Sequence, residues 1–388
     1  MREAFVVAAK RTAIGKLGGE LREVEPQDLA SAVLRAVVNE MGIRKEEVEE
    51  IILGNVVGPG GNMGRLSALS AGFPDTTPGV AIDLQCGSGL QAIHIAAYEV
   101  IMGQRDLVIA GGVESSSRAP WKVQKPLNLY GAIGPAFFQR ARFAPYEIGD
   151  PDMGVAAENV AKQYRVSRED QDAFSLLSHQ KAVHAIKESK MVPEIAPFCL
   201  RDGTWFDQDE GPRSDTSLGK LSKLPPVFIP DGTVTAGNAC GINDGAAVVM
   251  IASGDACKRL GLRPVLRYMD SELVGVDPNY LGIGPIPAVR RLLTRTQLAM
   301  DEIDLIELNE AFASQVIASV RELSMPMDRL NVNGGAIALG HPYGASGAIL
   351  LTRLFYELQR RKGKYGLATL GVGGGLGIAS VWERVVCY

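Results

Sequence analysis

Features that would point to a membrane-spanning or disulfide-rich protein are missing from this sequence. No uncharged apolar run reaches the roughly 18 residues of a membrane-spanning helix, so we expect no membrane span. Cysteine is scarce, and its five positions are odd in number, widely spaced and free of any Cys-x-x-Cys motif. This pattern indicates reduced thiols in a reducing compartment. The cysteines are Cys86, Cys199, Cys240, Cys257 and Cys387.

Neither sign of charge is in large excess. The chain has 40 basic and 44 acidic residues, and its net charge of −4 argues against nucleic-acid or anionic membrane partners. A local basic patch could still bind a phosphorylated cofactor. The chain starts almost directly in the strand-like residues 4–9, and its last three residues are not a peroxisomal signal. We therefore expect a cytoplasmic protein.

Apolar patterning indicates several structural units, since 388 residues are too many for one simple core. Strand and helix signals alternate over residues 1–117, including a buried helix over 89–102 and a strand over 107–110 that ends at Gly111 and Gly112. This rhythm is typical of a sheet covered on both faces. We predict an α/β fold with a first half of residues 1–117 and 242–264. An inserted loop domain of residues 118–241 and a second half of residues 265–388 complete it.

The two halves are copies of one unit. The pattern of residues 47–53 recurs at 302–308, and the same offset places Cys86 on His341. Each of these two residues precedes a run of glycine, alanine and serine that leads into an apolar helix. A thiol and an imidazole at equivalent helix entrances of two packed repeats would meet across a pseudo-twofold axis. The pair is a candidate nucleophile and base.

Cys86 allows two interpretations. A thiol at a helix N-terminus is favoured as thiolate by the helix dipole, and Gly87 and Gly89 leave room for a bulky substrate. Most free cysteines, however, are small core residues. His341 favours the catalytic interpretation, because Pro342 suits a first helical turn and would place the imidazole at the N-cap, uncrowded among glycines and alanines.

The chain resembles the thiolase family along nearly its whole length. The resemblance rests on several long motifs in the family's order, which are residues 83–90, 110–115, 153–160, 232–238, 241–246, 309–313, 331–347 and 373–377. It implies the thiolase fold, in which duplicated βαβ halves form a five-layer αβαβα sandwich with an inserted loop domain.

The resemblance also implies catalytic roles. The cysteine that Cys86 matches takes the acyl group from an acyl-CoA thioester, and the histidine that His341 matches activates it. The backbone N–H groups of Cys86 and Gly373 would form one oxyanion hole. His341 and a water held by Asn309 would form the other.

Coenzyme A is the ligand that the resemblance implies, as a substrate rather than a covalently bound cofactor. Arg213 matches a position that contacts the nucleotide. Phe228 and Phe312 match positions that wall the pantetheine, and Met153 and Cys240 lie at further contact positions. From the residues alone, Arg213 is equally a solvated charge and the phenylalanines are equally core. No metal is implied.

One departure from the family pattern bears on the chemistry. Thiolases carry a second reactive cysteine two residues before the C-terminal glycine run, and Gly371 stands at that position. Glycine has no side chain to exchange a proton, and losing a positioned acid or base typically costs ~10²–10⁴-fold in rate. Cys240, which replaces a usual serine, is a candidate substitute, and so is a water in the space left at Gly371. Asp152 replaces a usual histidine, and the 121–145 loop differs as well.

Three functions remain open at this point. The first is an acyl-CoA C-acyltransferase of thiolase type, which makes or cleaves 3-ketoacyl-CoA in lipid or fatty acid metabolism. The second is an acyl-CoA hydrolase, an acyltransferase to another acceptor or a decarboxylative condensing enzyme, because Gly371 lacks the acid/base thiol. The third is a non-catalytic CoA-ligand binding protein. Because thiolase cores associate through their sheets, the resemblance implies a homodimer or homotetramer.

Overall fold

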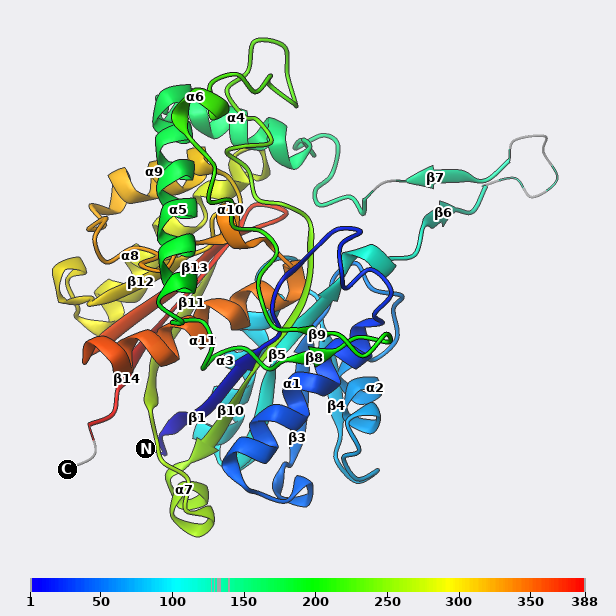
Figure 1. The fold of residues 1–388 in the computed structure, drawn as a ribbon, viewed down its shortest axis with the longest axis vertical. Helices are drawn as coiled ribbons and strands as arrows, with labels where there is room; N and C mark the ends of the chain where they lie inside the picture. Colours follow the sequence, from blue (N-terminus) through cyan, green and yellow to red (C-terminus); the bar gives the residue numbers. More distant parts are fainter. Residues whose placement is uncertain (1, 127, 129, 131–133, 139, 387–388) are drawn as a thin grey trace.

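The protein is an α/β structure with a large central sheet, here as a computed structural model (Figure 1). The structure describes residues 2–126, 128, 130, 134–138 and 140–386. Cys387 and parts of the 121–145 loop therefore lie outside the described residues. Among these residues no helix combines the length and the apolar character that crossing a membrane requires.

The main sheet contains ten strands within the described residues. Their bounds are β1 Ala4–Arg11, β2 Gly15–Lys16, β3 Glu50–Gly54, β4 Gly79–Ile82, β5 Leu107–Ser115, β10 Asn243–Ser253, β11 Leu266–Gly275, β12 Leu305–Leu308, β13 Tyr365–Val372 and β14 Leu376–Arg384. The strand order is β12-β13-β14-β11-β1-β10-β5-β3-β4, with β2 paired to β10.

Strand pairing shows the predicted duplication. In the first half β3 and β5 are parallel, β5 and β10 antiparallel, and β10 and β1 antiparallel. In the second half β12 and β13 are parallel, β13 and β14 antiparallel, and β14 and β11 antiparallel. The halves join where β1 meets β11, through the pairs Phe5–Arg267 and Val6–Leu266.

Helices form the other layers. Their bounds are α1 Pro26–Met41, α2 Met63–Ser70, α3 Ser88–Met102, α7 Gly254–Leu260, α8 Pro285–Thr296, α9 Ala313–Leu323, α10 Ala336–Leu339 and α11 Tyr343–Arg361, with 3₁₀ turns at Lys45–Glu47, Ser116–Arg118, Pro278–Ile283 and Met300–Glu302. Helices α3 and α11 pack on each other and contact strands of the first half, and α11 also packs on β12 and β13. Helices α1 and α2 cover the outside of the first half, and α8 covers that of the second. The five-layer sandwich is confirmed.

Helix α3 lies inside the molecule, which explains its nearly all-apolar sequence. Leu90, Ile93, Ala97 and Val100 are fully buried on it. Burying a leucine or isoleucine side chain contributes about 1.5–3 kcal/mol. The alignment that sets Cys86 on His341 also sets Ser88, the first residue of α3, on Tyr343, the first residue of α11. The two central helices are therefore equivalent elements of the repeat.

Residues 118–241 add α4 Met153–Gln163, α5 Arg168–Lys187, α6 Leu218–Leu221, and the hairpins β6 Lys122–Gln124 with β7 Ala136–Phe138 and β8 Phe198–Cys199 with β9 Trp205–Phe206. The β6–β7 hairpin extends away from the body of the molecule (Figure 1). Glu158 on α4 accepts hydrogen bonds from the backbone of Thr233 and Val234, which ties the later loop to the helix. The domain boundaries themselves stay a prediction.

One predicted strand boundary is wrong. Strand β5 does not end at Gly111 and Gly112 but continues to Ser115, because both glycines pair with β10. Their missing side chains serve close packing, since a Cβ on Gly112 would lie 1.8 Å from the Gly344 carbonyl oxygen at the start of α11. The patterns did not predict β14 or α9.

Candidate active site

Cys86 lies in a strained turn between β4 and α3. The residue before it, Gln85, has a left-handed backbone with φ of 48°. Ser88 fixes the turn, because its hydroxyl accepts from the Leu84 N–H at 2.8 Å and donates to the Gln85 carbonyl at 2.6 Å. A non-glycine residue in such a conformation costs on the order of 1–3 kcal/mol, and strain of this kind clusters at functional sites.

Glycines bring the entrances of α3 and α11 into contact. A Cβ on Gly89 would lie 2.5 Å from the Gly344 carbonyl oxygen, and one on Gly347 would lie 2.4 Å from the Leu90 nitrogen. Such distances are far below a normal contact, so only glycine permits this approach. Cys86 precedes Gly89 by three residues, as His341 precedes Gly344. Both side chains therefore stand at the same end of the central helical layer.

His341 is 2% exposed and is held at both ring nitrogens. Its Nδ1 lies 2.6 Å from the Ser346 hydroxyl, which in turn donates to the Pro342 carbonyl. Its Nε2 lies 3.5 Å from the Asn309 amide nitrogen. One tautomer satisfies these contacts, with the proton on Nδ1 donated to Ser346 and a lone pair on Nε2. Burial lowers the pKa of His341 to about 4, so the imidazole is neutral at neutral pH and its Nε2 can accept a proton.

The predicted N-cap position of His341 is wrong by one residue. Helix α11 begins at Tyr343, and Pro342 is the N-cap with φ −74° and ψ 91°. His341 instead forms an isolated parallel bridge with Ile242, and its N–H donates to the Asn243 side chain at 2.9 Å. This anchoring fixes the backbone that carries the imidazole.

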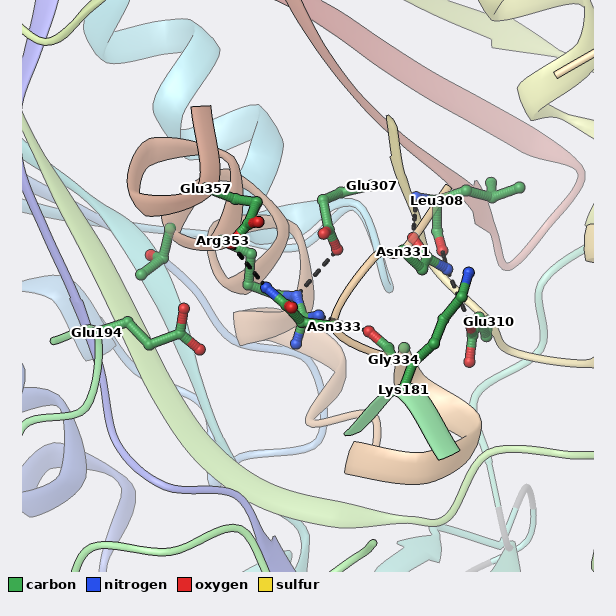
Figure 2. Close-up of polar contacts among 12 residues, drawn as sticks. Lys181, Glu194, Glu307, Leu308, Glu310, Asn331, Asn333, Gly334, Arg353 and Glu357 are labelled. Carbon is green, nitrogen blue, oxygen red and sulfur yellow. Dashed lines mark hydrogen bonds and ion pairs between the residues drawn. The ribbon is translucent and has the colours of Figure 1, made fainter. Parts of the chain in front are cut away.

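A buried polar clamp holds Asn309 at the end of β12. The Asn331 side chain accepts from the Leu308 N–H at 2.9 Å, donates to the Leu308 carbonyl at 2.9 Å and donates to Glu310 at 2.8 Å (Figure 2). Asn331 adopts a left-handed backbone with φ of 41° to do so. Since Leu308 and Glu310 flank Asn309, the clamp fixes the direction in which the Asn309 amide points.

Cys86 is not the preformed thiolate that the helix position predicts. Burial, with a smaller contribution from the Glu114 carboxylate, raises the pKa of its thiol to about 12. The backbone N–H groups of Gly373 and of Cys86 lower the pKa but do not outweigh the loss of water. The resting pair is therefore a neutral thiol with a neutral imidazole, and a thiolate forms only by proton transfer during reaction.

The neutral state of the Cys86 thiol predicts how its absorption changes with pH. The thiolate absorption in the ultraviolet, taken as wild type minus Cys86→Ser, should stay absent from about pH 5 to about pH 9, because the raised pKa keeps the thiol protonated. It should grow only as the pH approaches about 12. A thiolate already present at neutral pH would contradict the neutral pair, and Cys199→Ser, an exposed thiol, is the matched control.

The C-terminal glycines face the Cys86 turn. A Cβ on Gly373 would lie 3.4 Å from Gln85 Cγ, and the Gly373 N–H lowers the pKa of the Cys86 thiol. Gly371 lies two residues earlier, near the end of β13. A Cβ there would lie 3.2 Å from the Gly282 carbonyl oxygen, which leaves room for a small side chain after a shift of a few tenths of an ångström.

Cys240 and Tyr343 complete the surroundings of the pair. The Cys240 N–H donates to the Ala311 carbonyl at 3.0 Å. Burial and the neighbouring Cys86 raise the pKa of Cys240 to about 12. The ring of Tyr343 meets His341 edge to face at 5.1 Å, and its pKa is raised by burial and by both thiols. The two thiols, the phenol and the imidazole thus form one cluster.

The structure brings together most of the predicted CoA-contact residues. The rings of Phe228 and Phe312 meet edge to face at 6.2 Å. A Cβ on Gly154, next to Met153 at the start of α4, would lie 2.1 Å from the Phe228 ring. Arg213 is exposed, and its backbone N–H donates to His179 on α5 at 3.2 Å. No contact in the described chain joins Arg213 to the two phenylalanines.

Several residues around the site were missed by the sequence patterns. Ser346 and Asn243 hold His341, and the buried Glu114 accepts from the Gly344 N–H at 3.0 Å. Burial raises the pKa of Glu114 to about 7. The sequence does carry a signal for Glu114, which is the one acidic residue in the apolar run of β5. The described cysteines are free, and no cluster of metal-ligating side chains occurs in the described residues.

Two family models match nearly the whole chain. The model described as "Thiolase, N-terminal domain" matches residues 4–255, and the model described as "Thiolase, C-terminal domain" matches residues 262–384.

Relatives and solved structures agree with these models. A Staphylococcus epidermidis protein named "Putative acetyl-CoA C-acetyltransferase VraB" is 46% identical over 99% of both chains. A crystal structure of the Bacillus anthracis acetyl-CoA acetyltransferase superposes with a TM-score of 0.94 at 39% identity, over 99% of both chains. Human mitochondrial 3-ketoacyl-CoA thiolase in complex with CoA superposes with a TM-score of 0.93 at 38% identity, over 99% of this chain and 98% of that one.

Proposed function

Because the chain belongs to the thiolase family, we propose that it is an acyl-CoA C-acyltransferase that carries the acyl group on Cys86 and uses His341 as its base. The chain has the thiolase fold and is an acyltransferase, and the making or cleaving of 3-ketoacyl-CoA is the proposed reaction. The observation that carries the proposal is the buried, neutral imidazole of His341, whose Nε2 carries a lone pair at the helix entrance next to that of Cys86.

In the proposed acylation, His341 Nε2 takes the proton of the Cys86 thiol as the sulfur attacks the thioester carbonyl. The Gly373 and Cys86 N–H groups, which favour negative charge on the Cys86 sulfur, would stabilise the oxyanion of the tetrahedral intermediate. The carbon–sulfur bond to CoA then breaks, and His341 returns its proton to the CoA thiolate. Acyl-Cys86 and free CoA result, with the imidazole neutral again.

In the proposed carbon–carbon step, charge develops on the thioester oxygen of a second acyl-CoA. The Asn309 amide, fixed by Asn331 and set 3.5 Å from His341, supports a role in holding a water against that oxygen. The step also needs a group that takes or gives a proton at the α-carbon. Gly371 offers none, and Cys240 or a water is the proposed replacement.

Coenzyme A, or its acyl thioester, is the proposed small-molecule partner, used as substrate. The edge-to-face contact of Phe228 with Phe312, beside Met153 and Cys240, supports a pantetheine wall. Arg213 has an exposed side chain that is suited to a phosphate of the nucleotide. A cytoplasmic location, a role in fatty acid metabolism, and a homodimer or homotetramer belong to the same proposal.

Gly371 favours a second candidate. Acylation needs Cys86 and His341, whereas carbon–carbon bond chemistry needs the acid or base that Gly371 lacks. An acyl-Cys86 enzyme of this kind would pass its acyl group to water or another acceptor, or would condense a donor activated by decarboxylation.

Product analysis separates the two candidates. Acetoacetyl-CoA and CoA are supplied, and acetyl-CoA is measured as the product of thiolysis. In a second assay acetyl-CoA alone is supplied. The release of free CoA is measured together with any acetoacetyl-CoA that forms. We expect thiolysis in wild type and in Cys199→Ser but none in Cys86→Ser. Steady CoA release without carbon–carbon chemistry would reject the thiolase reaction and support the second candidate.

A further inference from the structure

A small cavity lies next to the side chains that hold His341. Its volume, measured for the centre of a water-sized sphere, is about 20 Å³. Its polar lining comes from Glu307, Asn309, Ser346 and Arg353, each at most 3% exposed. Asn309 and Ser346 are the hydrogen-bond partners of the His341 ring. The cavity therefore connects the partners of the imidazole with a pair of charges outside the site.

Strand and helix periodicity place these four side chains around one space. Glu307 and Asn309 are two residues apart on β12 and its extension, so they point to the same face. Ser346 and Arg353 are seven residues apart on α11, about two turns, so they share one helical face. Each element thus contributes one partner of His341 and one charged residue.

Arg353 has a hydrogen-bonding group without a partner. Its Nε donates to Glu307 at 2.9 Å, and its Nη2 donates to the Gly334 carbonyl (Figure 2). Its Nη1 is buried and has no partner among the described residues. A buried donor left unsatisfied costs about 1–3 kcal/mol, so an ordered partner is expected there.

A water molecule fits this requirement. A cavity needs roughly 10–15 Å³ of such room to hold one water, which typically bonds to about three polar groups. Arg353 Nη1 is a donor. Asn309 turns its Nδ2 toward His341, so its Oδ1 is left to accept from the water. The Glu307 carboxylate and the Ser346 hydroxyl line the same space.

We propose that Arg353, paired with Glu307, is a positioning residue for His341, acting through a water held in this cavity against Asn309 and Ser346. The inference rests on the proposed function, in which His341 is the base. The water fixes the two side chains that select the tautomer with a lone pair on Nε2. Arg353 touches no reacting atom.

Paired substitutions distinguish positioning from plain structural support. Removing one member of a buried ion pair leaves an uncompensated charge, whereas replacing both by apolar residues of similar size is often neutral for stability. The variants are Arg353→Met, Glu307→Met and the double variant. If the pair served stability alone, the double variant would regain both folding and acylation.

Two measurements are made on each variant, alongside urea unfolding. The first is single-turnover acylation of Cys86 by acetyl-CoA. The second is the ¹⁵N spectrum of the His341 ring, assigned by its absence in His341→Ala, since the chain has only four histidines. The ring spectrum needs no activity, so a failure of the proposed reaction is distinguished from a failure of the positioning role.

We expect the double variant to regain stability but to acylate about 10–100-fold more slowly than wild type, a loss of the size known for removing the hydrogen-bond partners behind metal-bound histidines. Its His341 spectrum should change from the single Nδ1-protonated form to a mixture. Unchanged ring signals in the double variant would overturn the proposal. A wild type that does not acylate Cys86, but whose ring spectrum still changes in the double variant, would overturn the proposed function and leave the positioning role standing.

Arg353→Lys keeps the inference testable if the methionine variants fail to fold. Lysine keeps the buried charge opposite Glu307, but its single ammonium replaces a fork that reaches Glu307, Gly334 and the cavity. We expect at least about tenfold slower acylation and the same mixture of ring forms. Wild-type acylation with an unchanged ring spectrum would overturn the proposal. Arg105→Met, which removes the partner of the buried Glu50 outside the cavity lining, controls for lost stability alone.

Discussion

Replacing His341 by alanine is expected to slow acylation of Cys86 by acetyl-CoA by about 10²–10⁴-fold, the usual effect of losing a positioned base. The reason is the high pKa of Cys86, about 12, which leaves almost no thiolate at neutral pH without a base. The single-turnover release of CoA measures the loss. His184→Ala, at an exposed histidine paired with Glu188, is the matched control and should acylate like wild type.

The pH dependence of acylation tests which protonation state of His341 is active. In wild type, acylation should fall as the pH drops below about 4, because the imidazole then becomes protonated and stops accepting a proton. Above that value the rate should be nearly constant. In His341→Ala only preformed thiolate reacts, so the rate should rise about tenfold per pH unit toward the Cys86 pKa. A wild-type rate that climbs in the same way would contradict the assignment of His341 as base.

Introducing cysteine at Gly371 is expected to raise thiolysis of acetoacetyl-CoA by about 10²–10⁴-fold, because the variant carries a thiol where the thiolase resemblance expects the proton donor. The backbone has room for the change, since the new Cβ would lie 3.2 Å from the Gly282 carbonyl oxygen and needs only a small shift. The rates of acetyl-CoA formation in wild type and Gly371→Cys measure the effect.

Gly371→Ala is the matched control, because it adds the same Cβ without a thiol and should leave thiolysis unchanged. If Cys240 already supplies the proton, Gly371→Cys should gain little and Cys240→Ser should abolish thiolysis in the wild-type background. Full thiolysis by Cys240→Ser would show that Cys240 is not the substitute. An equal gain in Gly371→Ala would contradict the missing-thiol explanation.

The repeat and the equivalent positions of Cys86 and His341 could be predicted because each copy carries a similar local sequence. The offset that aligns the copies sets Cys86 on His341, and the same offset aligns the first residues of α3 and α11. Gly89 and Gly344 also carry a local signal, since glycine is the residue that lets two backbones approach. The fold class followed from this pattern and is confirmed by strand pairing in both halves.

The protonation state of the site could not be predicted, because it depends on burial. A helix N-terminus favours a thiolate at Cys86, but the protein packed around the sulfur raises its pKa more than the backbone N–H groups lower it. The tautomer of His341 depends on Ser346 and Asn309, which lie on different elements. No spacing rule joins Glu307 to Arg353, which only the crossing of β12 and α11 brings together.

The most direct test of the account is the mass of the protein after brief incubation with acetyl-CoA, followed by peptide mapping. The account predicts one acetyl group on Cys86 in wild type, released as the CoA concentration is raised, and none in Cys86→Ser. Cys240→Ser should still acetylate. An acetyl group on another residue, or none in wild type while free CoA accumulates, would contradict a covalent acyl-Cys86 intermediate.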